Sequence, residues 1–209
     1  MADGGWAVTV ACEDRDFTEW RGGAEQVLVW AVDVDVPGVR AMLASARQHW
    51  ADVLLPRYDR QPHVTVGYGG PMPADGPAPM DEVYTTGRVE EARAAVEALR
   101  LAPFEVRIGG WASFQMSPYV AARAPELEAL AEALGEGLER PYVPHVTIGH
   151  YGVAVPLAEV AVSGECWESP EVVVPVDRVS LMRYDAADIA GSLTEVGCVP
   201  LRGVASRGG

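Results

Sequence analysis

Two copies of one short motif carry the residues of this chain that could do chemistry. Residues 62–67 read Pro-His-Val-Thr-Val-Gly, and residues 144–149 read Pro-His-Val-Thr-Ile-Gly. The alternation of polar and β-branched residues predicts a strand for each copy, and side chains two positions apart in a strand share a face. His63 and Thr65 should therefore lie side by side, as should His145 and Thr147. Because the chain has only four histidines, two at matching positions indicate a paired function.

Two imidazoles suit in-line displacement at phosphorus. A neutral imidazole can take a proton from the attacking water, and a protonated one can give a proton to the leaving oxygen, since the reference pKa of histidine is about 6.5. The threonine hydroxyls can donate hydrogen bonds to the non-bridging oxygens. Neither motif has a second histidine or a carboxylate at ligand spacing, so we expect no metal and no cofactor, with a zinc site and an inactive duplication as rival interpretations.

Each motif follows a predicted helix, which makes the repeat structural as well as local. A strand is predicted for residues 27–36 and a helix for residues 37–50, before the first motif. Helices near 90–101 and 125–138, with strands between them, precede the second motif, and a strand at 177–184 comes last. Residues 67–81 read as a loop rich in Gly and Pro. This order predicts an α+β fold of two pseudo-symmetric lobes, with the motif strands facing each other across a central cleft.

We expect residues 27–201 to form a single bilobal domain. Residues 1–26 read as an N-terminal extension that could add a strand, and residues 202–209 as a flexible tail. No apolar run reaches the roughly 18–20 residues of a membrane span, and the N-terminus lacks the basic start of a secretory signal. The three cysteines fit neither a zinc spacing nor a disulfide framework, which favours a cytoplasmic location.

The net charge of −14 argues against non-specific binding of long nucleic acid, because such binding needs a basic face that neutralises phosphates. A small or short anionic ligand in a local pocket fits better. We expect a monomer with no membrane contact and no extended nucleic-acid face. All 16 basic residues are arginines, so arginine is the only permanent cation available to bind a phosphate.

Three further residues are candidates for substrate binding. Tyr151 could stack on a base if the second motif strand continues that far, although a half-solvated tyrosine at a strand end is the alternative. Arg183, in the last predicted strand, could hold a phosphate, although it shares phase with apolar neighbours. Tyr119 could stack on a base together with Trp111 and Phe114, with core packing as the alternative.

Tyr68 and His150 occupy equivalent places just after the two motifs. Both fall out of phase with the motif histidines, because each lies five positions after its histidine. We therefore expect these two side chains to pack or to face away from the site.

The paired motifs also carry a family resemblance. Two His-x-Thr motifs, each followed by an aliphatic residue and separated by most of a lobe, resemble those of the two-histidine (2H) phosphoesterase superfamily. The resemblance covers roughly residues 27–185, including the order of elements. It implies two lobes of antiparallel sheet with outer helices and a cleft between them. It also implies that His63 and His145 are the catalytic pair and that Thr65 and Thr147 bind the phosphate.

That superfamily includes the bacterial RNA 2′,3′-cyclic phosphodiesterases, also called 2′,5′-RNA ligases. The resemblance thus implies a metal-independent phosphodiesterase that opens the 2′,3′-cyclic phosphate of a nucleotide or a short RNA end. Two alternatives keep the same pocket. One is a hydrolase of cyclic oligonucleotide signals, whose compact shape suits an acidic surface. The other is a nucleotide- or RNA-binding module without turnover, which would not need both histidines.

Overall fold

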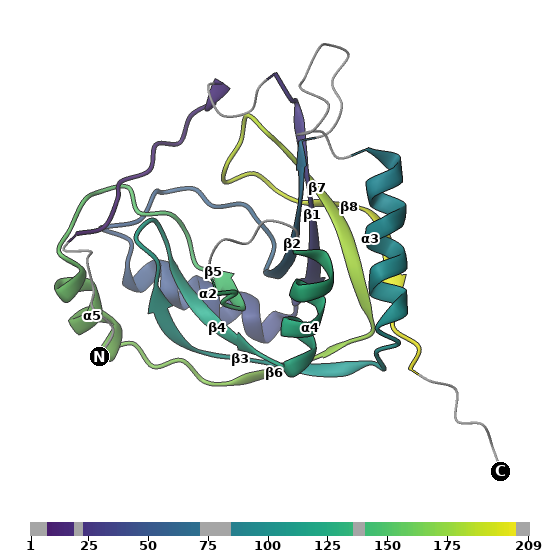
Figure 1. Ribbon diagram of the computed structural model, residues 1–209. Coiled ribbons are helices and arrows are strands. Elements are labelled where there is room, and N and C mark those ends of the chain that lie inside the picture. The colour runs from purple at the N-terminus through teal and green to yellow at the C-terminus, as the bar shows by residue number, and fades with distance from the viewer. Residues whose placement is uncertain (1–7, 19–22, 72–84, 136–140, 204–209) are drawn as a thin grey trace.

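A computed structural model of the chain shows two antiparallel sheets with helices packed against them (Figure 1). It describes residues 8–18, 23–71, 85–135 and 141–203. The first sheet has the order β2 (His63–Pro71), β1 (Gln26–Asp33), β7 (Arg178–Asp185), β8 (Thr194–Pro200), and the second has the order β5 (His145–Thr147), β4 (Pro118–Arg123), β3 (Phe104–Ser113), β6 (Val172–Val176). These two sheet lobes confirm the predicted α+β fold class. In the ranges just given, no helix is both long and apolar enough to cross a membrane.

The described helices are α2 (Pro37–His49), α3 (Thr86–Ala98), α4 (Pro125–Leu134) and α5 (Leu157–Glu165). Proline begins both α2 and α4, as predicted, because its fixed φ suits the first helical turn. Glu126 and Glu128 add negative charge to the first turn of α4, where the helix dipole is positive. The Thr85 side chain caps α3 by accepting a hydrogen bond from the Arg88 backbone N–H.

The helix before each motif packs against the opposite lobe. At the end of α2, the Arg47 Nε donates to the Ile148 carbonyl oxygen just after β5 (2.7 Å). In the other direction, α4 contacts β2, where a Cβ added to Gly67 would lie 2.8 Å from the Leu134 Cβ. This exchange of helices ties the two lobes together and brings the two motif strands near each other.

One hydrophobic core joins the inner faces of both sheets to α2 and α4. In each motif the aliphatic side chains enter this core, so the histidine and threonine side chains of the same strands point to the other face. The core includes Trp30, Val32, Leu43, Val64, Val66, Val120, Leu127, Leu130, Val146 and Ile148, each at most 1% exposed.

Some elements differ from the sequence-based expectation. The strand β2 continues to Pro71, so residues 67–71 of the predicted loop are strand, while residues 72–84 lie outside the described residues. The helix α5 and the strand β8 were not predicted at all. The second motif strand is short and ends at Thr147.

The N-terminal segment 8–18 lies along the second lobe. The Thr9 backbone N–H donates to the Val155 carbonyl oxygen (2.8 Å), and the Cys12 N–H donates to the Tyr151 carbonyl oxygen (2.7 Å). Val8 forms an isolated bridge with Pro156 and joins neither sheet. Residues 1–7 and 19–22 of the predicted extension, and residues 204–209 of the predicted tail, lie outside the described residues.

Candidate active site

The two motif strands are the edge strands that meet between the lobes. Both β2 and β5 lie at the edge of their sheets, and they contact each other. His63 begins β2 and His145 begins β5. The contact between β2 and β5 brings the two imidazoles close enough for the charge of a protonated His145 to lower the pKa of His63. The fold therefore brings the two predicted catalytic residues to one region.

The two histidines have the same hydrogen-bonding arrangement. The His63 Nδ1 lies 2.8 Å from the Gln61 carbonyl oxygen, and the His145 Nδ1 lies 2.7 Å from the Val143 carbonyl oxygen. Because a carbonyl oxygen can only accept, each Nδ1 carries a proton and donates. The Nε2 of each ring is then the atom left to exchange protons with a substrate. The repeated Pro-His turn thus orients both rings and selects the same tautomer.

Burial keeps both imidazoles neutral in the free protein. His63 is 9% exposed, and burial lowers its pKa to about 4, with the charges of Arg60 and His145 acting in the same direction. His145 is half-buried, and burial lowers its pKa as well. In both residues the hydrogen bond from Nδ1 to the carbonyl oxygen opposes this effect in part.

The two threonines lie on the same sheet faces as the histidines. Thr65 pairs with Ala31 across β1, and Thr147 pairs with Tyr119 across β4. The Tyr142 hydroxyl, from the second lobe, donates to the Thr65 carbonyl oxygen (2.9 Å) and fixes β2 from across the lobe boundary. Both threonine side chains are half-buried and so remain accessible to a ligand.

Aromatic rings surround His145. The ring centroid of Phe114 lies 4.9 Å from that of His145 in an edge-to-face arrangement, and the centroid of Tyr119 lies 5.3 Å away. Phe114 and Tyr119 themselves lie 4.4 Å apart. Trp111 packs elsewhere, against Trp50 at 5.6 Å. Of the three aromatic residues grouped by sequence, two therefore border the site and the third belongs to the core.

The interpretation of Tyr151 as a base-stacking residue was wrong. Its side chain is 0% exposed, and its hydroxyl is hydrogen-bonded to the Ser113 hydroxyl (2.7 Å). The strand ends at Thr147, so the alternation that placed Tyr151 in phase with His145 does not reach it. The residue packs inside the second lobe.

The interpretation of Arg183 as a phosphate ligand was also wrong. Arg183 pairs with Leu28 across β1, and Leu28 points into the main core. Directly paired residues share a face of an antiparallel sheet, whereas Thr65 shares its face with Ala31. Arg183 therefore lies on the opposite face of the first sheet from the motif residues.

Tyr184, the next residue, lies on the sheet face of the histidines and packs against Arg60, a cation that the sequence analysis did not identify. The guanidinium carbon of Arg60 lies 4.0 Å from the centroid of the Tyr184 ring. The charge of Arg60 lowers the pKa of His63, in the first motif, and the pKa of His150, just after the second motif, so Arg60 lies close to both motifs. Arg60 comes only three residues before His63, which is the one signal in the sequence that could have pointed to it.

Tyr58 was missed as well. Burial raises the pKa of the Tyr58 phenol, and the charge of Arg60 and the neighbouring Thr147 side chain act in the opposite direction. The Tyr58 ring lies edge-on to His150 with centroids 5.3 Å apart. Tyr58 therefore lies beside Thr147, one of the two predicted phosphate-binding hydroxyls.

Tyr68 differs from the expectation because β2 contains a bulge. Gly67 pairs with Trp30 but Thr65 pairs with Ala31, so Val66 is an extra residue in the ladder. Tyr68 consequently pairs with Val29 on the histidine face and is 59% exposed. A bulge cannot be read from simple alternation, although the glycines after the motif are compatible with one.

An ion-pair cluster around Arg57 fixes the segment that contains Tyr58 and Arg60. Arg57 makes paired hydrogen bonds to Asp14 (2.6 and 3.1 Å) and to Asp188 (2.7 and 2.9 Å). These carboxylates raise the pKa of Arg57, so it stays protonated. The cluster links the N-terminal segment, the segment before the first motif and the connection between β7 and β8.

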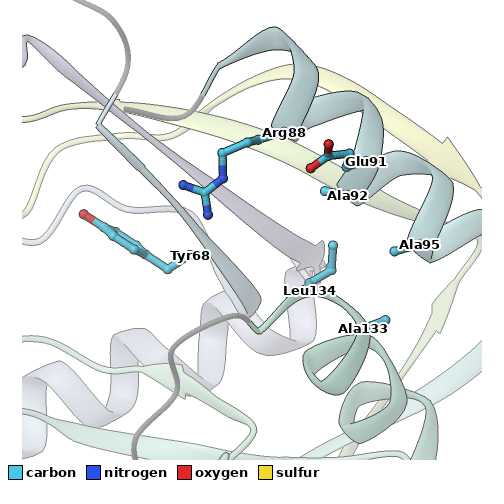
Figure 2. A pocket seen from close by; sticks show the side chains of 7 residues that line it. All are labelled: Tyr68, Arg88, Glu91, Ala92, Ala95, Ala133 and Leu134. Carbon is cyan, nitrogen blue, oxygen red and sulfur yellow. The ribbon is translucent and has the colours of Figure 1, made fainter. Parts of the chain in front are cut away.

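A separate cavity of about 210 Å³ lies between α3 and α4 at the outer edge of β2 (Figure 2). Arg88 reaches into it from α3, and Tyr68 stands at the edge of the strand. Its other lining residues come from the two helices, and it contains neither motif histidine. Within the described ranges, no group of three or more His, Cys, Asp and Glu side chains is placed to hold a metal ion.

Comparisons with known proteins define the class. The fold is that of TT0787 of Thermus thermophilus (TM-score 0.55, 21% identity, covering 86% of this chain and 100% of that chain). It is also that of E. coli LigT in its apo form (TM-score 0.56, 18% identity, 86% and 99%). A further structure, described as a phosphoesterase, has a TM-score of 0.57 at 16% identity (85% and 99%). No curated protein matches the chain by sequence.

Residues 58–188 match the 2′-5′ RNA ligase superfamily, and this segment is more than half of the chain and contains both motifs. The chain therefore belongs to the 2′-5′ RNA ligase superfamily. This membership confirms the resemblance to the 2H phosphoesterases and supports an activity of the phosphoesterase type.

Proposed function

We propose that this protein is a metal-independent phosphodiesterase that opens the 2′,3′-cyclic phosphate of a nucleotide or a short RNA end. The paired histidines, each with Nδ1 bound to a carbonyl oxygen and Nε2 left to exchange a proton, carry this proposal. Two imidazoles supply both proton transfers that the displacement needs, and two hydroxyls supply donors for the charged oxygens. The site residues we propose are His63, His145, Thr65 and Thr147, with Tyr119 at the border.

In the proposed step the two histidines have different roles. The Nε2 of neutral His63 takes a proton from water, whose oxygen forms a bond to phosphorus. The bond from phosphorus to one ribose oxygen breaks, and protonated His145 gives its proton to that leaving oxygen. We assign the base to His63 because burial and the charge of Arg60 keep it neutral. A bound phosphate dianion or diester would favour protonation of the more accessible His145.

The surroundings of the site fit a small nucleotide. Phe114, half-buried beside His145, offers ring surface to a base, as aromatic side chains do in the recognition of unstacked bases, and Tyr119, 9% exposed, packs against it. E. coli LigT, one of the structures with this fold, was solved in complexes with ATP and with 3′-AMP. The chain's charge of −14 favours a compact ligand over a long polyanion. We place the protein in the cytoplasm as a monomer, with its three cysteines unpaired.

Incubation with 2′,3′-cyclic nucleotides and short RNAs that end in a cyclic phosphate, in the presence of EDTA, tests the proposal. We expect conversion to a nucleoside 2′- or 3′-monophosphate, and loss of conversion in the His63→Gln variant. No turnover of any of these compounds would remove this substrate class. Activity that disappears on addition of EDTA would replace the mechanism by a metal-dependent one.

The same assay separates the alternatives. Cyclic di- and trinucleotides that are hydrolysed faster than the cyclic mononucleotides would favour a hydrolase of cyclic oligonucleotide signals. Ligand binding by calorimetry with no product, and with affinity that survives His63→Ala, would favour a binding module.

A further inference from the structure

We propose that the candidate active site includes a second anion subsite beside Thr147, formed by Arg60, Arg47 and His150 around the ring of Tyr58, and that this subsite takes a phosphate group other than the one attacked. The inference rests on the proposed function and narrows its substrate class. The preferred substrate would carry a phosphate on the 5′ oxygen of the nucleoside that bears the cyclic phosphate.

Buried nitrogen atoms without partners gather at this place. The Arg60 Nε, the Arg47 Nη2 and the His150 Nδ1 are buried and have no hydrogen-bond partner. Within the described ranges only one other buried side-chain nitrogen or oxygen is in this condition, the Nε1 of Trp50. Because buried polar atoms are nearly always hydrogen-bonded, such a concentration indicates an external acceptor. The arginine atoms donate as they stand, whereas burial and the charge of Arg60 lower the pKa of His150, so its Nδ1 donates only when a bound anion favours protonation of the ring.

These groups converge on one side chain next to the site. The guanidinium carbon of Arg47 lies 5.2 Å from the Tyr58 ring centroid, and the His150 ring lies 5.3 Å from it. The charge of Arg60 acts on both Tyr58 and His150. Tyr58 in turn lies beside Thr147. All of these side chains are half-buried, so parts of the group are exposed to solvent although the three unpartnered nitrogen atoms are covered.

The acidic groups close to these arginines are engaged elsewhere. Asp59 and Asp188, whose charges interact with Arg47 and Arg60 respectively, are both hydrogen-bonded to Arg57. Arg47 donates to a backbone carbonyl oxygen at Ile148. Among the residues that the structure describes, no carboxylate is bound to either of these two guanidinium groups, in a chain whose net charge is strongly negative. Phosphate is the anion that guanidinium groups bind best, through paired N–H donors.

The position of the subsite points to a second phosphate. The strand β5 runs from His145 to Thr147, and Arg47 donates to the carbonyl oxygen of Ile148 beyond its end, so Arg47 lies past Thr147 as seen from His145. Phe114 and Tyr119 lie beside His145. A nucleotide in the site would place its base near these aromatic rings, its cyclic phosphate between the histidines and its 5′ substituent near Arg60. That substituent is a phosphomonoester on a free nucleotide and a phosphodiester on an RNA end.

Kinetics on three substrates test the inference. We compare kcat/KM for a 2′,3′-cyclic nucleotide with a 5′-hydroxyl, the same nucleotide with a 5′-phosphate, and a dinucleotide that ends in the cyclic phosphate. We expect the second phosphate to raise kcat/KM by about tenfold or more, as a charge-assisted hydrogen bond does. A gain with the dinucleotide alone would identify the RNA end as the source, and a gain with both would show that the phosphate group itself suffices. Equal values for all three would overturn the inference while leaving the proposed function intact.

Variants locate the effect. Arg60→Gln should bring the ratio between the substrates close to one, and Arg60→Lys should keep part of it, because lysine keeps the charge and loses the paired donors. Arg183→Gln is the matched control: it removes the same charge from the opposite face of the sheet and should leave the ratio unchanged. A ratio that survives Arg60→Gln, or that Arg183→Gln abolishes, would contradict the assignment.

Binding gives a readout that does not depend on turnover. Calorimetry with adenosine 3′,5′-bisphosphate and with adenosine 3′-monophosphate should show at least tenfold tighter binding of the bisphosphate, lost in Arg60→Gln and kept in Arg183→Gln. If no cyclic phosphate is hydrolysed but the bisphosphate still binds more tightly, the proposed function fails and the subsite stands. Equal affinities would overturn the subsite.

Discussion

The two copies of the motif are almost identical in sequence and differ in their surroundings. His63 is 9% exposed and lies near the charge of Arg60, whereas His145 is half-buried beside the rings of Phe114 and Tyr119. Both rings have the same tautomer, set by the same turn. The repeat therefore supplies two equivalent proton carriers, and the non-repeated residues give them different properties. A general base and a general acid need this difference, because one must start neutral and the other protonated.

The first prediction concerns the loss of activity when either motif histidine is replaced. His63→Gln and His145→Gln should each lower kcat by about 10²- to 10⁴-fold toward a 2′,3′-cyclic nucleotide, because each loses one of the two proton transfers. Steady-state kinetics at pH 7 with EDTA measures both. His49→Gln is the control, since His49 bonds Ser163 on the surface, and it should change kcat by less than about twofold. A variant of either motif histidine with near-normal kcat would remove that residue from the mechanism.

The second prediction concerns stability against acid. The pKa of His63 is about 4 in the folded protein and about 6.5 unfolded, so between these values the unfolded state binds more protons. The free energy of unfolding should fall as the pH is lowered from 6.5 to 4, by up to about 3 kcal/mol from this residue alone. Urea titrations across this range should show a shallower fall for His63→Gln than for the wild type. His145→Gln should flatten it less, because His145 is more exposed, and equal curves for wild type and His63→Gln would contradict the burial argument.

The third prediction uses the glycine that follows each motif. A Cβ on Gly67 would lie 2.8 Å from the Leu134 Cβ, whereas a Cβ on Gly149 would meet only Leu54, at 3.5 and 3.7 Å. Gly67→Ala should therefore cost about 1–3 kcal/mol of stability, because α4 must move away from β2. Gly149→Ala is the matched control and should stay within about 0.5 kcal/mol of wild type in urea unfolding. Equal losses of stability at both positions would contradict the tighter packing described around Gly67.

The fourth prediction separates the two threonines. Tyr58→Phe removes the hydroxyl that lies beside Thr147 and should lower kcat by about tenfold with little change in KM, because Thr147 loses a partner that orients its own hydroxyl. In a Thr147→Val background the same change should have no further effect, whereas in a Thr65→Val background it should keep its full effect. This difference distinguishes a positioning role from a general loss of stability. A full Tyr58→Phe effect in both backgrounds would contradict the contact.

Local patterns were enough to predict which face carries the motif residues and most of the elements around them. The alternation in residues 62–67 and 144–149 sends Val64 and Val146 into the core, which places His63 and His145 on the other face. Proline at the first position correctly started α2 and α4. The short α5 and the strand β8 were missed because a nine-residue helix and a largely exposed edge strand carry weak periodicity.

The errors in the site have tertiary causes. Arg183 was considered without knowing which face of the first sheet is covered by the main core. Tyr68 reached the histidine face through a bulge, and Tyr151 lost its phase because β5 stops at Thr147. Arg60 and Tyr58 lie outside any regular element, and their segment is held against the second lobe by backbone hydrogen bonds such as that from the Leu55 N–H to the His150 carbonyl oxygen. Such contacts join residues far apart in the chain, so no periodic pattern records them.

In the proposed mechanism both imidazoles act on one phosphorus in one step. The direct measurement is kcat/KM of the His63→Gln, His145→Gln double variant beside the two single variants, on a 2′,3′-cyclic nucleotide with EDTA. Groups that act as a unit give strongly non-additive losses. We predict that the double variant is about as slow as the slower single variant. Losses that multiply would show that the two histidines work independently, and would contradict the shared site.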